Sequence, residues 1–396
     1  FILGDHLTLT LPFLAPLFLL WEDVRMLLIF QAVWISASLI AIFKLVLLRK
    51  FSSLAALALG FVYSLFYGIQ FLVFFDFHPV VIGVGLLPWL AYFLESKQKR
   101  LFWLMLILLL LTQENMGLAL SSLGLLYLFK QGYRTTAIAC VVGGIAASLL
   151  AAKIIALFSP VGFQYAPQLT LHPILFIQQL FDSTEKQQVW LYSFAWFSFL
   201  PLLSPGAILA VTLDLAQYFT TGPEFARMWS PFMHHRAILA PYLLLGTLDA
   251  LSWLKTKKIN PQTVSLILVF GVLVQQLIFH FPLNKLSKPA YWQTEPWMKD
   301  NKQLMENIPP DARIATQQSL IPHLSHRKEI YLAWPRVHDF PSKSCGQVSC
   351  WWLDFDSKAQ WLFIDTHPNQ WITQLLETNE HVTSALTNME REGKIK

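Results

Sequence analysis

Asp76-Phe77-His78-Pro79 places a carboxylate and an imidazole close together beside a long apolar segment. We expect both to face a cavity, where they can hold a divalent metal, bind a diphosphate through that metal, or exchange protons with a substrate. The alternative is structural, because Asp76 can cap a helix that has Pro79 in its first turn. The roles are compatible, and the cost of placing such groups in apolar surroundings favours a function for at least one of them.

A second polar group, Gln113-Glu114-Asn115, interrupts the apolar stretch 101–129. The pattern predicts two short helices that meet at a polar break. A carboxylate at such a place must be hydrated, paired or protonated, because an isolated charge in hydrocarbon costs several kcal/mol. A water-exposed turn is the alternative, and the shortness of the flanking helices favours a cavity.

The pair Asp5-His6 precedes an apolar segment that contains Pro12 and Pro16 and that resembles an interfacial or re-entrant piece. The pair supports a functional site only if it lies on the same side of the membrane as Asp76 and His78. The chain begins at Phe1 rather than methionine, so we expect it to be part of a longer protein.

His234-His235-Arg236 forms a further polar group, preceded by Glu224 and Arg227. Successive helical residues diverge by about 100°, so at most one histidine is expected to serve a given site. The planar guanidinium of Arg236 can grip a phosphate. Anchoring of a helix end at the membrane surface is an equally weighted alternative.

The composition is that of a membrane protein: 55% of the 396 residues are hydrophobic, 13% are charged, and the mean hydropathy is +0.48. Soluble domains carry about 25% charged residues. Apolar segments near the length needed to cross about 30 Å of hydrocarbon occupy 24–48, 54–75, 79–94, 135–158, 189–203, 232–254 and 264–281. With the broken segment 101–129 and the pair 189–203 and 207–219, the sequence predicts an all-α polytopic transmembrane bundle of about nine to ten segments, some short and broken.

The net charge of +5 reflects orientation rather than a nucleic-acid partner, which we do not expect. An alternating path through the segments brings the basic residues to one side, which is cytoplasmic by the positive-inside rule. These residues are Arg49-Lys50, Lys97 to Arg100, Lys130 with Arg134, and Lys255 to Lys258. The acids and histidines described above, and Lys153 near a helix end, then lie on the opposite, outer side. The expected location is the cytoplasmic (inner) membrane.

The sequence divides into a transmembrane domain, 1–284, and a small soluble domain, 285–396, which we expect to be extracytoplasmic. Runs typical of strands (313–316, 329–332 and 361–364) alternate with helical or loop segments (297–307 and 369–377), which predicts an α/β fold. Cys345 and Cys350 are compatible with a disulfide in an oxidising compartment, and a zinc site is poorly supported. Cys140 is expected to be a packing residue. No glycine-rich phosphate loop, GxSxG, HExxH or CxxC motif occurs.

Several of these strings resemble a family of prokaryotic multi-pass membrane proteins known as domain of unknown function 2079. They are Gly4-Asp5-His6, Pro12, Pro16, Gln31, Phe75 to Pro79, Gln113-Glu114, His234-His235, Ile308 to Ala312 and Ile321 to Arg327. The resemblance covers nearly the whole chain. That family is similar to the GT-C superfamily of integral-membrane glycosyltransferases, which use polyprenyl-phosphate-linked sugars on the non-cytoplasmic side.

The GT-C resemblance implies inversion at the anomeric carbon, with a carboxylate as base and cations or a metal at the departing lipid phosphate. In this sequence the implied catalytic candidates are Asp76, His78, Glu114, Asp5 and His6, with His234 and His235 as further candidates. Lys153, Arg236 and Arg227 are the phosphate-binding candidates. A divalent ion, Mg²⁺ or Mn²⁺, is expected at Asp76 and His78. Membrane lipid and a polyprenyl-phosphate sugar donor are the expected partners. The GT-C catalytic carboxylate usually lies in the first outer loop, to which Asp5 can belong.

The alternative to an enzyme is a non-enzymatic membrane protein, either a transporter or an envelope assembly factor. A transporter needs polar residues near the middle of several spans and access from both sides. The polar residues of this sequence gather in the outer layer, which favours the transferase.

Overall fold

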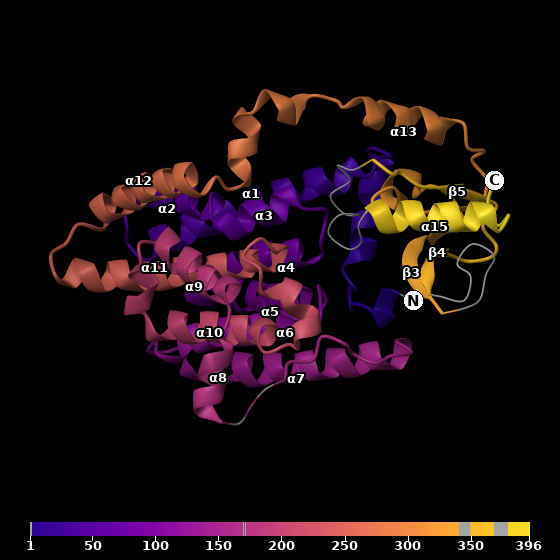
Figure 1. Ribbon diagram of the computed structural model, residues 1–396. Coiled ribbons are helices and arrows are strands. Elements are labelled where there is room, and N and C mark those ends of the chain that lie inside the picture. Colours follow the sequence, from indigo (N-terminus) through magenta and orange to yellow (C-terminus); the bar gives the residue numbers. More distant parts are fainter. Residues whose placement is uncertain (1, 169, 171, 340–348, 368–378) are drawn as a thin grey trace. The chain divides into compact units, whose positions relative to one another are not determined.

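The computed structural model describes residues 2–168, 170, 172–339, 349–367 and 379–396. The chain divides into two compact units, Phe1–Tyr291 and Trp292–Lys396 (Figure 1). The sequence predicts this boundary between residues 284 and 285.

The first unit is a bundle of helices (Figure 1). Its α-helices are α1 (Arg25–Leu48), α2 (Ser53–Ser64), α3 (Tyr67–Phe74), α4 (Val80–Glu95), α5 (Lys99–Leu110), α6 (Met116–Leu128), α7 (Arg134–Phe158), α8 (Pro173–Gln179), α9 (Thr184–Trp196), α10 (Pro205–Phe219), α11 (Leu239–Thr256) and α12 (Pro261–Phe279). Short 3₁₀ helices join them: η1 (Ile2–Gly4), η2 (Leu11–Leu19), η3 (Leu200–Leu203), η4 (Pro223–Trp229), η5 (His234–Ile238), η6 (Pro282–Ser287) and η7 (Pro289–Trp292).

Four helical stretches among the described residues are long and apolar enough to cross a membrane: Arg25–Leu48, Arg134–Phe158, His234–Thr256 and Pro261–Phe279. A fifth results if α2 and α3, which are bent by 53°, are counted as one broken span. The structure thus supports a polytopic helical membrane protein. It does not confirm about nine to ten segments, because helices such as α4 and α6 are shorter than a full span.

The segment 54–75, which the sequence predicts as a span, is the bent pair α2 and α3 in the structure. Helix α2 ends at Ser64 and α3 begins at Tyr67. The side-chain amide of Gln70 donates a hydrogen bond of 2.6 Å to the carbonyl of Leu65. A polar side chain therefore satisfies a backbone group that the break releases, as an apolar environment requires.

The expected span 189–203 is also interrupted, because α9 ends at Trp196 and Ser198 and Phe199 adopt φ values of 47° and 58°. Residues other than glycine rarely adopt such φ values, and these positions end the helix. The chain then reverses at Ser204, whose hydroxyl accepts a hydrogen bond from the backbone N–H of Ala207 at the start of α10. The sequence predicts this reversal between the segments 189–203 and 207–219.

Close packing of α6 on α7 positions the polar break that contains Glu114. A Cβ atom added to Gly117 would lie 2.4 Å from the carbonyl oxygen of Gly144, and one added to Gly144 would lie 2.3 Å from that of Gly117. The hydroxyl of Ser148, on α7, donates to the backbone carbonyl of Glu114 at 2.8 Å. Small residues thus let the two backbones touch, a common means of helix association in membranes.

The junctions that carry the predicted cytoplasmic charges meet at one end of the bundle, called here the basic end. The guanidinium of Arg49, after α1, donates from Nε to Glu95 at 2.9 Å and from Nη1 to Asp249 at 2.8 Å. Lys130, between α6 and α7, lies 2.8 Å from Asp249, and Ser204 donates to the same carboxylate at 3.0 Å. Helix ends far apart in the sequence are therefore joined by ion pairs.

In its described residues, the second unit contains two small sheets and the α-helices α13 (Pro296–Glu306) and α15 (Asn379–Arg391). Strands β1 (Ile314–Thr316), β2 (Ile330–Leu332) and β5 (Trp361–Phe363) form a parallel sheet in the order β2-β1-β5. Strands β3 (Trp334–His338) and β4 (Cys350–Asp354) pair antiparallel. A short 3₁₀ helix, η8 (Ile321–Leu324), precedes β2.

Three of these strands are the ones that the sequence predicts, and the prediction of an α/β pattern is confirmed to that extent. Strands β3 and β4 and helix α15 were not expected. The proposed helix or loop at 369–377 lies outside the described residues. The same holds for Cys345, so its disulfide with Cys350 stays a prediction, whereas Cys140 is a free, buried cysteine as expected.

Candidate functional site

Glu114 lies in a buried turn at the end of the bundle opposite the basic end, called here the site end. Helix α5 ends at Leu110 and α6 begins at Met116, so two short helices meet at the polar break as predicted. The turn is not water-exposed: Thr112 is fully buried and Glu114 retains only 9% of its exposure. The backbone N–H of Leu9 donates to the carbonyl of Leu111 at 3.0 Å, which ties the N-terminal segment to this turn.

Asp5, His6 and Glu114 form a linear arrangement, called here the acid–imidazole chain. Nδ1 of His6 lies 2.7 Å from Oε1 of Glu114, and Nε2 of His6 lies 3.9 Å from Oδ2 of Asp5. The other oxygen of Glu114 accepts the backbone N–H of Leu7 at 3.2 Å. Tyr165 donates its hydroxyl to Asp5 at 3.2 Å and stacks on His6. Exposure falls along the chain, from 66% for the Asp5 side chain to 35% for His6 and 9% for Glu114.

The pKa of His6 is raised above its ordinary value of 6.5. Burial acts to lower this pKa, but the hydrogen bond to Glu114, the charge of Glu114 and the charge of Asp5 together outweigh burial. The imidazole therefore holds its proton more firmly than a free histidine. An imidazole between two carboxylates is a suitable element for moving or orienting a proton.

His78, His234 and His235 form a second group, called here the histidine cluster. The ring centroids of His78 and His234 are 3.8 Å apart, and those of His234 and His235 are 4.1 Å apart. The cluster depends on close contact of η5 with α3, because a Cβ atom on Gly68 would lie 2.5 Å from the backbone carbon of Arg236. Both adjacent histidines join one group, contrary to the expectation that only one would do so. The reason is that η5 is a 3₁₀ helix and His235 also reaches Tyr218.

Asp76 and His78 do not act as a pair of side chains. The side chain of Asp76 is exposed. Nδ1 of His78 contacts the backbone carbonyl of Asp76 at 2.9 Å, not its carboxylate. Burial lowers the pKa of His78 and outweighs the opposite effect of Asp76, so this imidazole is neutral at pH 7. Of the two residues, His78 is the one that the structure places in the cluster.

Tyr218 and Asn115 connect the histidine cluster with the acid–imidazole chain. The rings of His235 and Tyr218 are 4.9 Å apart, and the side-chain amide of Asn115 donates to the hydroxyl of Tyr218 at 2.9 Å. Asn115 follows Glu114 directly in the buried turn. The predicted candidates at positions 5, 6, 78, 114, 234 and 235 thus belong to one connected region.

Many buried polar atoms in and beside this region have no hydrogen-bond partner within the described part of the chain. They are Oε1 of Gln113, Oδ1 of Asn115, Oδ2 of Asp214, Nδ1 of His234, Nδ1 of His235 and Nη1 of Arg236. Buried polar groups are nearly always satisfied in folded proteins, and an unsatisfied one costs about 1–3 kcal/mol. Their concentration here is typical of a site that binds polar ligand groups.

The phosphate-binding candidates lie in different settings. Arg236 is fully buried; its Nε donates to the carbonyl of Ser230 at 3.2 Å and its Nη2 donates to that of Met228. Arg227, on η4, is exposed, and its charge acts on Tyr165 and His235. Lys153 is exposed on α7. Arg227 is therefore the cation with access to solvent that acts on both parts of the site.

A metal ion is not supported by the side chains that the structure describes. Among those residues, no group of three or more histidine, cysteine, aspartate or glutamate side chains is placed to hold one. Asp76 and His78 contact each other only through a backbone carbonyl. The predicted Mg²⁺ or Mn²⁺ stays a prediction, and no step below depends on it.

Sequence reasoning missed Asp214, Tyr218 and Tyr165. Asp214 is fully buried in α10, where its Oδ1 accepts a hydrogen bond of 3.2 Å from the amide of Gln217, and its charge acts on Arg236 and Tyr218. A lone carboxylate in an apolar helix could have identified Asp214 as a candidate. The two tyrosines had no such pattern, because tyrosine is common in apolar segments.

The family model described as a predicted membrane protein, domain of unknown function 2079, matches residues 1–391. The chain belongs to this family. No curated protein and no solved structure matches the chain. The family description agrees with the apolar helices, and it states neither an activity nor a substrate.

Proposed function

We propose that this DUF2079 protein is a GT-C-like glycosyltransferase that takes a sugar from a polyprenyl phosphate on the outer side of the cytoplasmic membrane. The observation that carries the proposal is the acid–imidazole chain, which ends in exposed Asp5 and lies beside buried polar atoms that lack partners among the described residues. In this proposal the second unit, Trp292–Lys396, is extracytoplasmic.

Transfer with inversion forms a bond between the acceptor oxygen and the anomeric carbon while the bond from that carbon to the lipid phosphate breaks. The proton of the acceptor hydroxyl must pass to a base. Asp5 is the exposed carboxylate of the chain and takes this proton. His6 lies between the two carboxylates, and Glu114 orients its ring through the 2.7 Å contact. Positioned acid–base groups of this kind contribute about 10²–10⁴-fold to a rate.

The departing lipid phosphate carries the electron pair of the broken bond and needs a cation. Arg227 suits this role because it is exposed and its charge acts on Tyr165, the residue that donates to Asp5. Arg236 is engaged with backbone carbonyls and serves to position η5. Lys153 remains a second candidate for the lipid phosphate.

The pairing of charges at the basic end supports a transferase over a transporter. The ion pairs among Arg49, Glu95, Asp249 and Lys130 join helix ends at that end. A transporter must open on both sides, whereas a transferase needs access from one side only.

The test is transfer from undecaprenyl-phosphate-linked radioactive glucose or mannose to membrane extract, catalysed by the protein in proteoliposomes. Asp5→Asn and Glu114→Gln are expected to reduce the rate by at least about 10²-fold, with little change in the thermal unfolding curve. Glu185→Gln, which removes an exposed carboxylate on α9, is the matched control and should transfer at the wild-type rate. Wild-type protein that transfers neither sugar would contradict the function, and unchanged rates in both variants would contradict the role of the chain.

A further inference from the structure

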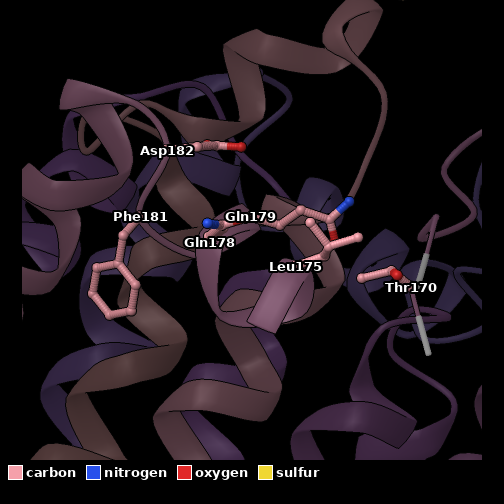
Figure 2. A pocket seen from close by; sticks show the side chains of 6 residues that line it. All are labelled: Thr170, Leu175, Gln178, Gln179, Phe181 and Asp182. Carbon is pink, nitrogen blue, oxygen red and sulfur yellow. The ribbon is translucent and has the colours of Figure 1, made fainter. Parts of the chain in front are cut away.

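A pocket of about 670 Å³ lies beside helix α8. It is lined by Thr170, Leu175, Gln178, Gln179, Phe181 and Asp182 (Figure 2). None of these residues belongs to the acid–imidazole chain or the histidine cluster. Figure 2 shows Leu175 and Thr170 opposite each other, and Phe181 and Asp182 in the segment after helix α8.

The polar side chains of this pocket suit hydroxyl groups. Gln178 and Gln179 offer amide donors and acceptors, Thr170 offers a hydroxyl, and Asp182 offers a carboxylate that accepts hydrogen bonds. No lysine, arginine or histidine is among the lining residues that the structure describes. A sugar can pair with such a surface through its hydroxyls, whereas a phosphate would meet a carboxylate without a facing cation.

Lys186 contacts residues that line this pocket, but it does not supply a cation for a bound phosphate. Its ammonium lies 2.7 Å from Oδ1 of Asp182 and donates at 2.8 Å to the carbonyls of Gln179 and Phe219. It also lies 3.9 Å from the ring centroid of Trp229, and its side chain is 1% exposed. An ammonium has three N–H donors, and these partners account for them. Lys186 therefore fixes the end of α8 rather than a ligand.

Gln179 provides independent evidence for a polar ligand. Its side-chain oxygen Oε1 is buried and has no hydrogen-bond partner in the described residues. Its backbone carbonyl, in contrast, is occupied by Lys186. A ligand hydroxyl in the pocket would supply the donor that this oxygen lacks.

The surface next to the pocket is apolar. Helix α8 buries none of its side chains, and Ile174, Leu175 and Ile177 remain 63%, 50% and 58% exposed. Phe181 is 42% exposed and stacks on Trp190 with a centroid distance of 5.2 Å. Exposed apolar side chains beside hydroxyl-binding groups match a molecule with a sugar and an alkyl chain.

We propose that the α8 pocket binds the neutral sugar headgroup of a glycolipid, with the alkyl chain lying over Ile174, Leu175 and Ile177. The sugar hydroxyls pair with Gln179, Gln178 and Asp182. This binding requires no transfer chemistry, so it stands or falls separately from the glycosyltransferase proposal.

The experiment measures binding of tritiated octyl glucoside to the protein in phosphatidylcholine nanodiscs by scintillation proximity, with excess unlabelled ligand defining the saturable part. Gln179→Leu should weaken binding about tenfold, which is the effect of one lost hydrogen bond in a buried site. Its backbone carbonyl still holds Lys186, so the fold of α8 is preserved. Gln164→Leu makes the same change at an exposed position of the loop before α8 and should bind like the wild type.

Competing ligands distinguish the chemistry and the source of the headgroup. Methyl glucoside should compete at least about tenfold more weakly than octyl glucoside, because it lacks the chain that covers the apolar surface. Octyl phosphate should compete weakly, because the pocket offers no cation. Equal competition by octyl phosphate, equal competition by methyl glucoside, or unchanged binding in Gln179→Leu would each overturn the proposal, as would the absence of saturable binding.

Discussion

At the basic end of the bundle, Arg49 contacts both Glu95 and Asp249, and Lys130 lies 2.8 Å from Asp249. At the site end, buried nitrogen and oxygen atoms of residues such as His234 and Asn115 lack partners within the described residues. Both ends place polar groups where helices of one bundle stop. They differ in that the charged groups at the basic end are joined in ion pairs, whereas the atoms named at the site end have no such partner within the described residues.

The difference separates residues that hold the bundle together from residues that are available to a ligand. Buried charges are tolerated when they are paired and hydrogen-bonded, and such pairs fix which helix ends meet. Unsatisfied polar atoms lower stability without helping the fold. Local departures of this kind are expected at functional sites. Changes at the two ends should therefore differ in their effects on stability and on function.

Arg49→Met should give the largest loss of stability. It removes the cation from between two carboxylates whose side chains are only 10% and 23% exposed. Breaking a buried ion pair by removing one partner costs about 3–5 kcal/mol. The unfolding free energy, measured by denaturant titration in detergent, should fall by this amount.

Arg25→Met is the matched control for that experiment. Arg25 pairs with Asp23 at 2.7 Å, but its side chain is 64% exposed, and exposed ion pairs contribute little. Its loss should leave the unfolding curve unchanged. Equal effects of the two substitutions would mean that the basic end is not held by its ion pairs.

Gly68→Ala should give the second largest loss of stability, because it separates η5 from α3 and disturbs the site end. The new Cβ atom would lie 2.5 Å from the backbone of Arg236, which cannot move as a side chain can. Overpacking of this kind costs about 1–3 kcal/mol. The measurement is again the unfolding free energy, together with the sugar-transfer rate.

Gly60→Ala tests whether that loss comes from the close contact. Gly60 lies in α2, and a Cβ atom there would meet nothing within 4 Å. Replacing a helical glycine by alanine should then stabilise the protein by about 0.5–1 kcal/mol. If Gly68→Ala behaves like Gly60→Ala, η5 does not need the close approach, and the histidine cluster is positioned by other contacts.

The basic end was predictable from the sequence, and the geometry of the site was not. Arg49 and Lys130 follow long apolar segments, so an alternating path alone brings them to one end of the bundle. The sequence also marked Glu114, because a carboxylate in an apolar run must be accommodated. Periodicity, however, does not specify which loops meet, and the contact between His6 and Glu114 joins positions that are 108 residues apart.

Short irregular elements account for the other differences between the site that the sequence predicts and the site in the structure. The sequence treats His234 and His235 as part of a regular helix, which would point them apart, whereas the 3₁₀ helix η5 and its contact with Gly68 bring both into one cluster. Asp76 was expected to share a cavity with His78, yet it is exposed. Loop conformation depends on tertiary contacts that a local pattern does not contain.

The pH dependence of the unfolding free energy tests the acid–imidazole chain. The expected change is smaller than for the substitutions at Arg49 and Gly68. The pKa of His6 is raised in the folded state, so the folded protein binds the proton more tightly than the unfolded chain. The stabilisation is complete below an unfolded pKa of about 6.5 and is lost as the pH rises through the folded value. It should be less than about 1 kcal/mol, because the side chain is 35% exposed and is partly screened by solvent.

His6→Gln provides the comparison needed for that measurement. The difference in melting temperature between wild type and His6→Gln should be largest near pH 5.5 and should shrink towards pH 8.5. A difference that grows with pH would contradict the pairing of His6 with Glu114.

His234→Phe should have the smallest effect on stability and a large effect on function. Phenylalanine keeps the ring that packs against His78 and Phe75, at centroid distances of 3.8 and 5.2 Å. It removes a buried nitrogen that lacks a partner among the described residues, so the unfolding free energy should change by less than about 0.5 kcal/mol or rise slightly. The sugar-transfer rate should fall, because the substitution removes polar atoms from the proposed site. If His234→Phe instead destabilises the protein as strongly as Arg49→Met, the histidine cluster supports the fold in the same way as the basic end, and the distinction between the two ends fails.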